Sequence, residues 1–491
     1  MRRGPLLLVF AFELASCGAE SGTKRIGSRK TGGRAIAVVP LRGSLRSDDR
    51  SFVAAFVTCG KNMSKKPMRR AIIAGGSLGG LFAGCMIRQR GWDVVIVERT
   101  KGRLAGRGAG LGVHPSMLEG LLRAGAKVDA TVGVAIGGRA VLARDGGIAA
   151  EIVMPQLCTS WARLHTLLSN VFPEDCVRRG VAVTAFEQDS GGVTAYLSNG
   201  ETLKGDVLIG ADGVRSTVRR QLLPKTELAY AGYVAWRGMV DERALSPTTH
   251  ATLFQRFAWG LASDGHIVGY PVPGPDDDVT PGRRCYNFVW YRRVETDPAL
   301  REMQTDAAGG HHPHGIPPQA IRGHFISDLR RDAGAVFCDA WAEVVRKVDQ
   351  PLFQPIGDLA SSQMCFDRVA LLGDAAYVAR PHVARGAIKA GDDAIALAEA
   401  LADFPAEDAL RKYDAVRRAA NAAIVAESRS LGSYIEGKGE RTADPVQFMR
   451  ENGGVEPSLV DGGLFFRLLR EAGFGGPASC PGSALDRKSV V

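Results

Sequence analysis

The chain has 491 residues, of which 45% are hydrophobic and 23% are charged. This length is too great for one ordinary domain and this balance is that of globular proteins, so two or three domains are expected and a largely disordered chain is excluded. The formal net charge of +10 comes from the first 70 residues, which hold 15 basic and 4 acidic side chains against 47 and 48 in the rest, so no basic face of a folded domain is expected for nucleic acid.

Residues 1–62 show no sustained hydrophobic period and are interpreted as a leader outside the folded part. A basic pair, a short apolar run and the sequence Leu14–Cys17 resemble an export signal, but the run is at the short limit for one and Glu13 adjoins it. We expect either a disordered extension or a start of translation at Met63 or Met68. The protein is therefore expected in the cytoplasm, and no later segment is apolar for the roughly 18 residues that would predict a membrane span.

The cysteines and histidines do not indicate a disulfide framework or a metal site. Nine cysteines are scattered singly with no C-x-x-C pair, which is typical of reduced thiols in a cytosolic protein. His311, His312 and His314 lie in a loop flanked by Gly and Pro, and no acidic or cysteine set accompanies them. No metal site is expected.

The first regular segment after the leader has the pattern of a strand, a glycine-rich turn, a helix and a second strand. A short apolar run at 71–74 is typical of a buried parallel strand, and GGSLGG follows it at 75–80. Small and apolar residues predict a helix over 81–90, and the strand 94–97 ends at Glu98. This is the βαβ fingerprint of dinucleotide binding, in which N–H groups at the start of the helix bind a pyrophosphate.

Two positions of this fingerprint carry specific expectations. Glu98 follows Gly75 by 23 residues, a spacing at which an acidic side chain can accept hydrogen bonds from a ribose. Ser77 replaces the middle glycine of G-x-G-x-x-G, and the same residues match G-x-S-x-G, the nucleophile turn of α/β-hydrolases. Ser77 could then be a nucleophile with Asp374 and His382 as its partners. Such a turn normally follows several strands, whereas this one follows the first, so dinucleotide binding is favoured.

Two later segments also end predicted strands in acidic residues. VLIGADGVRS at 207–216 predicts a buried strand followed by Asp212 and a serine-capped helix, and VALLGDAA at 369–376 predicts a strand that ends at Asp374. Ligands of open α/β sheets bind outside the carboxyl ends of the strands, so Asp374 is placed to bind hydroxyls of an extended cofactor. Capping of a following helix is the alternative role.

The three segments together resemble the signatures of single-component, flavin-dependent aromatic hydroxylases of the p-hydroxybenzoate hydroxylase fold. Flanking segments such as GWDVVIVER, YAGYVAWRG, GYPVPG and QPIGDL are similar to the 2,6-dihydroxypyridine 3-hydroxylase branch of that family. The resemblance covers residues 69–435, with the motifs in family order. It implies an α/β protein with a Rossmann-like FAD-binding domain built on a parallel sheet, an antiparallel-sheet substrate domain and C-terminal helices.

The resemblance also implies which residues hold FAD. The pyrophosphate would lie at the glycine turn, the adenosine ribose at Glu98, and the ribityl hydroxyls at Asp374. Arg107 would approach the phosphates or the ribityl chain, Asp212 would organise the nicotinamide side, and residues 381–386 would line the isoalloxazine ring. The full set of expected cofactor residues is Gly75, Ser77, Gly79, Gly80, Glu98, Arg99, Arg107, Asp212, Asp374, Pro381 and Gly386.

The chain departs from the family pattern at two positions. Ala384 stands where the flavin loop usually has a glycine, so the close approach of backbone that the glycine permits is not implied here. Trp161 stands where many relatives have an arginine that contacts FAD, and we interpret it as a feature of this branch.

The domain boundaries follow from changes in the sequence pattern. Residues 69–224 and 351–435 are assigned to the FAD-binding domain, and residues 225–350 mainly to the substrate domain. Residues 436–491 lose regular period and are expected to form an irregular tail.

The elements expected within these domains are strands rich in aromatic and branched residues and, later, two long helices. Their ranges are Tyr233–Arg237, Ala251–Trp259 and Asn287–Tyr291 for the strands and 387–401 and 413–434 for the helices.

The implied activity is hydroxylation of a small aromatic or N-heteroaromatic, hydroxypyridine-like ring with NADH or NADPH and O2, through a flavin C4a-hydroperoxide. His382 or Tyr233 would help to ionise a hydroxyl of the ring. A non-oxygenating FAD oxidoreductase and a catalytically silent FAD-binding protein are the alternative functions. A homodimer is left open, because the sequence does not determine the oligomeric state.

Overall fold

The computed structural model describes residues 68–102, 104, 110–313, 315–442, 444–452 and 463–473, which form two large sheets and the helices that cover them. The first sheet has the strand order β16-β17-β10-β1-β2-β6, and only the β16–β17 pair is antiparallel. Its strands are β16 (Cys365–Phe366), β17 (Val369–Leu371), β10 (Val207–Gly210), β1 (Arg70–Ala74), β2 (Asp93–Glu98) and β6 (Val177–Arg179). The central strands are completely buried, as their unbroken apolar runs predict.

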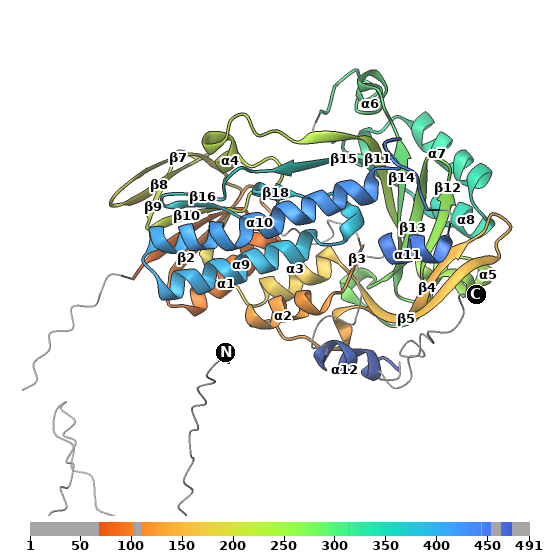
Figure 1. The fold of residues 1–491 in the computed structure, drawn as a ribbon, viewed down its shortest axis with the longest axis horizontal. Helices are drawn as coiled ribbons and strands as arrows, with labels where there is room; N and C mark the ends of the chain where they lie inside the picture. Colours follow the sequence, from red (N-terminus) through yellow and green to blue (C-terminus); the bar gives the residue numbers. More distant parts are fainter. Residues whose placement is uncertain are drawn as a thin grey trace, which may run out of the picture. The chain divides into compact units, whose positions relative to one another are not determined.

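Helices cover one face of this sheet and a small sheet covers the other (Figure 1). The helices are α1 (Leu78–Gln89), α2 (Pro115–Arg123), α3 (Trp161–Ser169), α9 (Gly386–Asp403) and, packed on α9, α10 (Ala406–Gly432). The small sheet is β7 (Val183–Asp189), β8 (Gly192–Leu197) and β9 (Thr202–Gly205), with α4 (Thr217–Leu222) beside it. This arrangement brings the carboxyl ends of β1, β2, β10 and β17 to one edge, where a ligand of such a sheet binds.

The second sheet has nine strands in the order β18-β15-β11-β14-β13-β12-β4-β5-β3 and is antiparallel except between β12 and β4. Its strands are β18 (Tyr377–Val378), β15 (Leu352–Ala360), β11 (Ala229–Asp241), β14 (Cys285–Arg293), β13 (Gly265–Val272), β12 (Arg256–Ala262), β4 (Val134–Leu142), β5 (Ile148–Ser160) and β3 (Gly110–Gly112). The α/β architecture with a parallel and an antiparallel sheet is therefore confirmed. The nine-stranded sheet also takes strands from the segments that the sequence analysis assigned to the FAD-binding domain.

Alternation along the strands gives the second sheet two different faces. One face packs against a helical layer and buries a core that includes Trp236, Phe288 and Trp290. The helices of this side are α5 (Pro247–Leu253), α6 (Asp297–Met303), α7 (Gly323–Val336) and α8 (Asp339–Lys347). The other face carries Tyr233 and Tyr291 and contacts the C-terminal part of the chain.

The structure differs from the expected elements in two places. The strand expected over 251–259 begins only at Arg256, because Ser246 accepts a hydrogen bond from Thr249 N and Pro247 occupies the first turn, so that helix α5 forms instead. The segment after residue 435, expected to be irregular, contains two helices. These are α11 (Pro445–Asn452) and α12 (Gly463–Glu471).

Both C-terminal helices are held by apolar side chains. Phe448 and Met449 of α11 are buried against the second sheet, and Phe465, Leu468 and Leu469 of α12 join the core of the first. Within the described part of the chain, no helix is long and apolar enough to cross a membrane.

Candidate functional site

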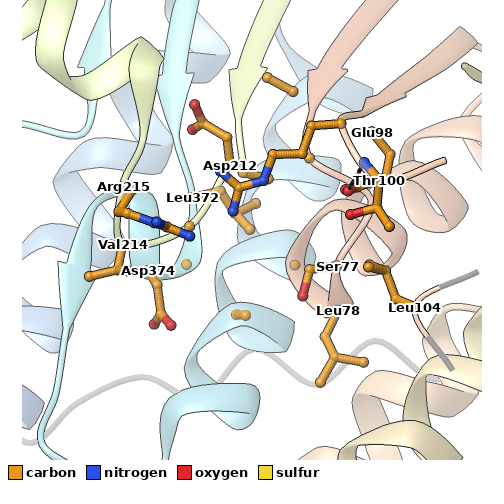
Figure 2. A pocket seen from close by; sticks show the side chains of 18 of the residues that line it. Ser77, Leu78, Glu98, Thr100, Leu104, Asp212, Val214, Arg215, Leu372 and Asp374 are labelled. Atoms are coloured by element: carbon orange, nitrogen blue, oxygen red, sulfur yellow. Dashed lines mark hydrogen bonds between the residues drawn. The ribbon is translucent and has the colours of Figure 1, made fainter. Parts of the chain in front are cut away.

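A cavity of about 540 Å³ lies at the edge where the strands of the first sheet end. Its walls come from the residues that follow β1, β2, β10 and β17 and from the start of α9. Figure 2 shows Glu98 and Thr100 on one side of this cavity, Arg215 and Asp374 on the other, and Asp212 between them. Among the expected cofactor residues, those that line it are Gly75, Ser77, Gly79, Glu98, Arg99, Asp212, Asp374 and Gly386.

Three expected cofactor residues are not among those lining the cavity. Gly80 lies in the first turn of α1, and a Cβ there would be 1.9 Å from the Gly75 carbonyl oxygen, so glycine is needed for the turn to close. Pro381 begins a 3-10 turn, Pro381–Val383, ahead of the cavity wall at Gly386. Arg107 falls outside the described residues.

The glycine turn leaves room for a ligand only because side chains are absent from it. Gly75 has φ +106°, and a Cβ there would lie 2.3 Å from the Ala211 carbonyl oxygen. Ser77 precedes α1, and its side chain makes no capping hydrogen bond to the helix. The first N–H groups of the helix therefore have no partner within it, and together with the helix dipole they suit a pyrophosphate.

Glu98 is 6% exposed, and both of its carboxylate oxygens already accept a hydrogen bond. Oε2 accepts from Gly76 N and Oε1 from Thr100 N, each at 2.8 Å. These bonds fix the carboxylate at the cavity wall and tie it to the glycine turn. Each oxygen keeps a second lone pair, so Glu98 can also accept from ribose hydroxyls.

Asp212 divides its two oxygens between the fold and the cavity. Oδ2 accepts from Thr217 N at 2.7 Å and from Val218 N at 3.3 Å, and so caps the start of α4 beside Ser216, whose hydroxyl accepts from Arg219 N. Oδ1 is buried and has no hydrogen-bond partner among the described residues. A buried acceptor of this kind is costly unless a ligand donates to it.

Two arginines give the cavity a positive charge. Arg99 follows β2, and Arg215 follows the Asp-Gly turn after β10. Burial lowers the pKa of Arg215, and the guanidinium groups of Arg99 and Arg220 lower it further. Arg99 was among the expected cofactor residues and Arg215 was not, although its motif, VLIGADGVRS, had been recognised. A phosphate-bearing ligand would relieve this repulsion.

Asp374 lies in a single 3-10 turn, Gly373–Ala375, directly after β17. Its side chain is 52% exposed, and its carboxylate lies 3.9 Å from the ammonium group of Lys389, which is completely buried. Helix α9 begins only at Gly386. Asp374 therefore does not cap that helix, and its carboxylate is available to a ligand in the cavity.

His382 and Tyr233, the two expected catalytic residues, are in contact with each other but do not line this cavity. Nε2 of His382 lies 2.8 Å from the Tyr233 hydroxyl, and its ring centroid lies 4.6 Å from that of Tyr291. Burial lowers the pKa of His382 to about 3, helped by the guanidinium groups of Arg380 and Arg237. Burial likewise raises the pKa of Tyr233, so both side chains are neutral near pH 7.

The two departures from the family pattern both have a structural consequence. Ala384 has φ 51°, a left-handed conformation that favours glycine, so the loop keeps the backbone form of a glycine without having one. Trp161 lines the cavity, and its ring stacks on that of His165 at 4.8 Å. His165 in turn lies 3.2 Å from the Gly76 carbonyl oxygen, so this aromatic pair supports the glycine turn.

Comparisons with known proteins point to one family. A family profile described as FAD binding domain-like matches residues 230–358. The 2,6-dihydroxypyridine 3-monooxygenase of Paenarthrobacter nicotinovorans is 32% identical over 330 residues, which are 67% of this chain and 82% of that protein. The 3-hydroxybenzoate 6-hydroxylase of Polaromonas naphthalenivorans is 29% identical over 400 residues, or 75% of this chain and 88% of the other.

A solved structure extends the similarity to three dimensions. The 2,6-dihydroxypyridine-3-hydroxylase from Arthrobacter nicotinovorans superposes with a TM-score of 0.72 at 28% identity, and the match covers 77% of this chain and 95% of that one. The relatives at this level are oxygenases, so the α/β-hydrolase interpretation of Ser77 is set aside.

Proposed function

The chain belongs to the FAD-dependent aromatic hydroxylases, and on that basis we propose that it hydroxylates a small hydroxypyridine-like ring with NADH or NADPH and O2. The observation that carries the choice of substrate class is the 32% identity to a 2,6-dihydroxypyridine 3-monooxygenase over 82% of that protein. The 29% identity to a hydroxybenzoate hydroxylase supports the wider class of hydroxylated aromatic rings.

The residues around the cavity fit FAD in an extended form. The N-terminus of α1 with Arg99 and Arg215 would bind the pyrophosphate, and Glu98 would accept from the adenosine ribose. Asp374 would accept from the ribityl hydroxyls at the opposite wall. Bound FAD would supply the redox chemistry, taking electrons from the nicotinamide and enabling O2 to deliver one oxygen atom to the ring.

His382 and Tyr233 stay proposed as the pair that receives a proton from the ring. The neutral imidazole of His382 can accept a proton, and its 2.8 Å contact with the Tyr233 hydroxyl allows the proton to be shared. Because neither side chain lines the FAD cavity, this role requires the ring to extend beyond the cavity as far as His382.

The function is tested by the oxidation of NAD(P)H in the presence and absence of candidate rings. The purified protein should contain FAD, and oxidation should rise at least about tenfold with a suitable hydroxypyridine, because a ligand that prefers the reducible arrangement by about 1.4 kcal/mol already gives that factor. Oxygen uptake and hydroxylated product should then agree one to one. Equal oxidation with every ring tested, with peroxide as the sole product, would identify a non-oxygenating flavoprotein instead.

A further inference from the structure

The face of the nine-stranded sheet that lies opposite α7 and α8 carries polar donors as well as aromatic rings. Trp236 of β11 packs on the helical side, so alternation along the strand places Tyr233, Ala235 and Arg237 on the other face. Arg237 stands opposite Val289 of β14, which belongs to the core cluster of that same face. An arginine therefore projects from a surface that is otherwise largely apolar.

Arg237 is half-buried and has no ion-pair or hydrogen-bond partner among the described residues, and its Nε is fully shielded from solvent. A guanidinium group has five N–H donors, and a shielded donor without an acceptor costs stability. Arg292 of the same sheet offers a contrast, because its guanidinium pairs with Asp332 at 2.8 Å on the helical side. The unpaired state of Arg237 is therefore unusual for an arginine of this sheet.

Asn287 supplies a second unpaired donor beside Arg237. It lies two residues before Val289, so it is a diagonal neighbour of Arg237 on the same face. Asn287 is 1% exposed, and its Oδ1 accepts from Gly110 N at 3.0 Å. This bond fixes the orientation of the amide, and Nδ2 is left buried without an acceptor in the described structure. Two shielded donors on adjacent strands thus lack the same thing, an acceptor.

Two connections link these donors to the wall of the FAD cavity. The hydrogen bond of Asn287 holds Gly110 at the start of β3, and the next residue, Leu111, lines the cavity. On the other side, the ring of His382 packs on Tyr291, and the loop from His382 reaches the cavity wall at Gly386. The donors therefore lie next to the place where FAD is proposed to bind.

The groups around Arg237 are neutral aromatic side chains. Tyr291 is its other diagonal neighbour, and Tyr270 stands opposite Asn287 on β13. Burial raises the pKa of Tyr291 to about 12, although the guanidinium of Arg237 opposes this shift, and the pKa of His382 is about 3. A planar ring with a negatively charged oxygen would satisfy this combination of one positive charge, one amide donor and several aromatic faces.

We propose that Arg237 and Asn287 select the substrate by binding a ring oxygen in its anionic form, as in a phenolate or an ionised hydroxypyridine. The inference rests on the proposed function, which it makes more specific. Charge-assisted hydrogen bonds from Arg237 and a neutral one from Asn287 would hold the ionised oxygen. Ionisation raises the electron density of the ring, which favours attack on an electrophilic oxygen.

The test measures the binding of 2,6-dihydroxypyridine to the FAD-loaded protein through the change in flavin absorbance. Arg237→Met should raise the Kd at least about tenfold, the effect of losing a charged hydrogen bond, without changing FAD content. Asn287→Asp keeps the acceptor for Gly110 N but puts a negative charge in place of the donor, and it should weaken binding as well. The matched control is Arg292→Met, which removes an arginine from the helical side of the same sheet and should leave the Kd unchanged.

A second ligand separates recognition of charge from recognition of shape. 2,6-Dimethylpyridine has a ring of similar size without an ionisable oxygen, and Arg237→Met should not weaken its binding. An unchanged Kd for 2,6-dihydroxypyridine in Arg237→Met would overturn the proposal. If that variant does not fold, an unchanged Kd in Asn287→Asp would overturn it instead. Failure of the proposed function is distinct, because the wild-type protein would then bind the ring and form no hydroxylated product.

Discussion

The acidic residues at the cavity differ in how much of their hydrogen-bonding capacity the fold already uses. Both oxygens of Glu98 accept backbone N–H groups, and one oxygen of Asp212 caps α4. Changes at either residue would disturb the fold together with any ligand contact. Asp374 has only a distant charge partner, the Lys389 ammonium at 3.9 Å, so it is the side chain at which cofactor binding is best separated from stability.

Asp374→Ala should weaken FAD binding by about 1.5–3 kcal/mol, the scale of a charged hydrogen bond, with a smaller effect on the melting temperature. The Kd is measured by adding FAD to the apoprotein and following flavin fluorescence. Asp403→Ala, at the exposed end of α9, controls for the loss of a carboxylate and should bind FAD normally. A lower melting temperature with an unchanged Kd would show that Asp374 has a structural role instead.

At the scale of elements, the C-terminal segments bury two histidines against the second sheet. His266 of β13 contacts the hydroxyl of Tyr434 and lies beside Phe448 of α11, while His382 comes from the loop before α9. The two imidazole rings are 5.9 Å apart. Burial lowers the pKa of His266 well below its usual value and that of His382 to about 3. The packing of these elements therefore requires both rings to be neutral.

Acid should destabilise this packing. Below pH ~6.5 the unfolded chain protonates both histidines and the folded chain does not, so the free energy of unfolding falls as the pH falls from about 6.5 toward 3, by up to roughly 1.4 kcal/mol per pH unit for each histidine. Above pH 7 the two residues should contribute no pH dependence. Urea unfolding at pH 7.5, 6 and 5 measures the slope.

His382→Gln tests the contribution of one of these histidines to that slope. Glutamine is neutral at every pH used and can still hydrogen-bond to Tyr233, so the slope should decrease by about one proton. His324→Gln removes an exposed histidine and controls for the substitution itself. An identical slope in wild type and His382→Gln would contradict the prediction.

The elements also illustrate what the sequence could predict. The strand, turn and helix at 70–90 and the acidic residues that follow the strands were recognisable because glycine turns and buried parallel strands have local signatures. Helix α5 was missed because the cap at Ser246 outweighs the β propensity of the residues after it. Helices α11 and α12 were missed because their apolar residues are few and gain their stability from distant partners in the two sheets.

For the site, the sequence predicted side chains near the cofactor better than those near the substrate. Eight of the eleven expected cofactor residues line the cavity, since each belongs to a motif at the end of a strand. Arg237 and Asn287 were not recognised, because they lie on separate strands, 50 residues apart, and only the register between β11 and β14 makes them neighbours. Such pairs have no local signature.

At the scale of the whole molecule, the basic charge and the folded part are separable. The first 70 residues carry 15 basic and 4 acidic side chains, and the rest of the chain is close to neutral with 47 and 48. Both sheets, their cores and every residue that lines the cavity come from residues 70–473. The described part thus contains the parts that an FAD-dependent hydroxylase needs to fold and to bind its cofactor.

A chain that begins at Met63 should therefore match the full-length protein in FAD content, melting temperature and stimulation by a hydroxypyridine. The physical reason is that residues 1–62 have no hydrophobic period with which to add to either core, so their removal should cost no buried apolar area. The same truncation removes most of the excess positive charge, so the shorter protein should elute earlier from a cation exchanger. The comparison uses both proteins purified in parallel, with FAD released by denaturation and measured by absorbance. A lower melting temperature or a loss of FAD in the shorter chain would show that the leader is part of the folded structure, and the functional boundary would then have to be placed before Met63.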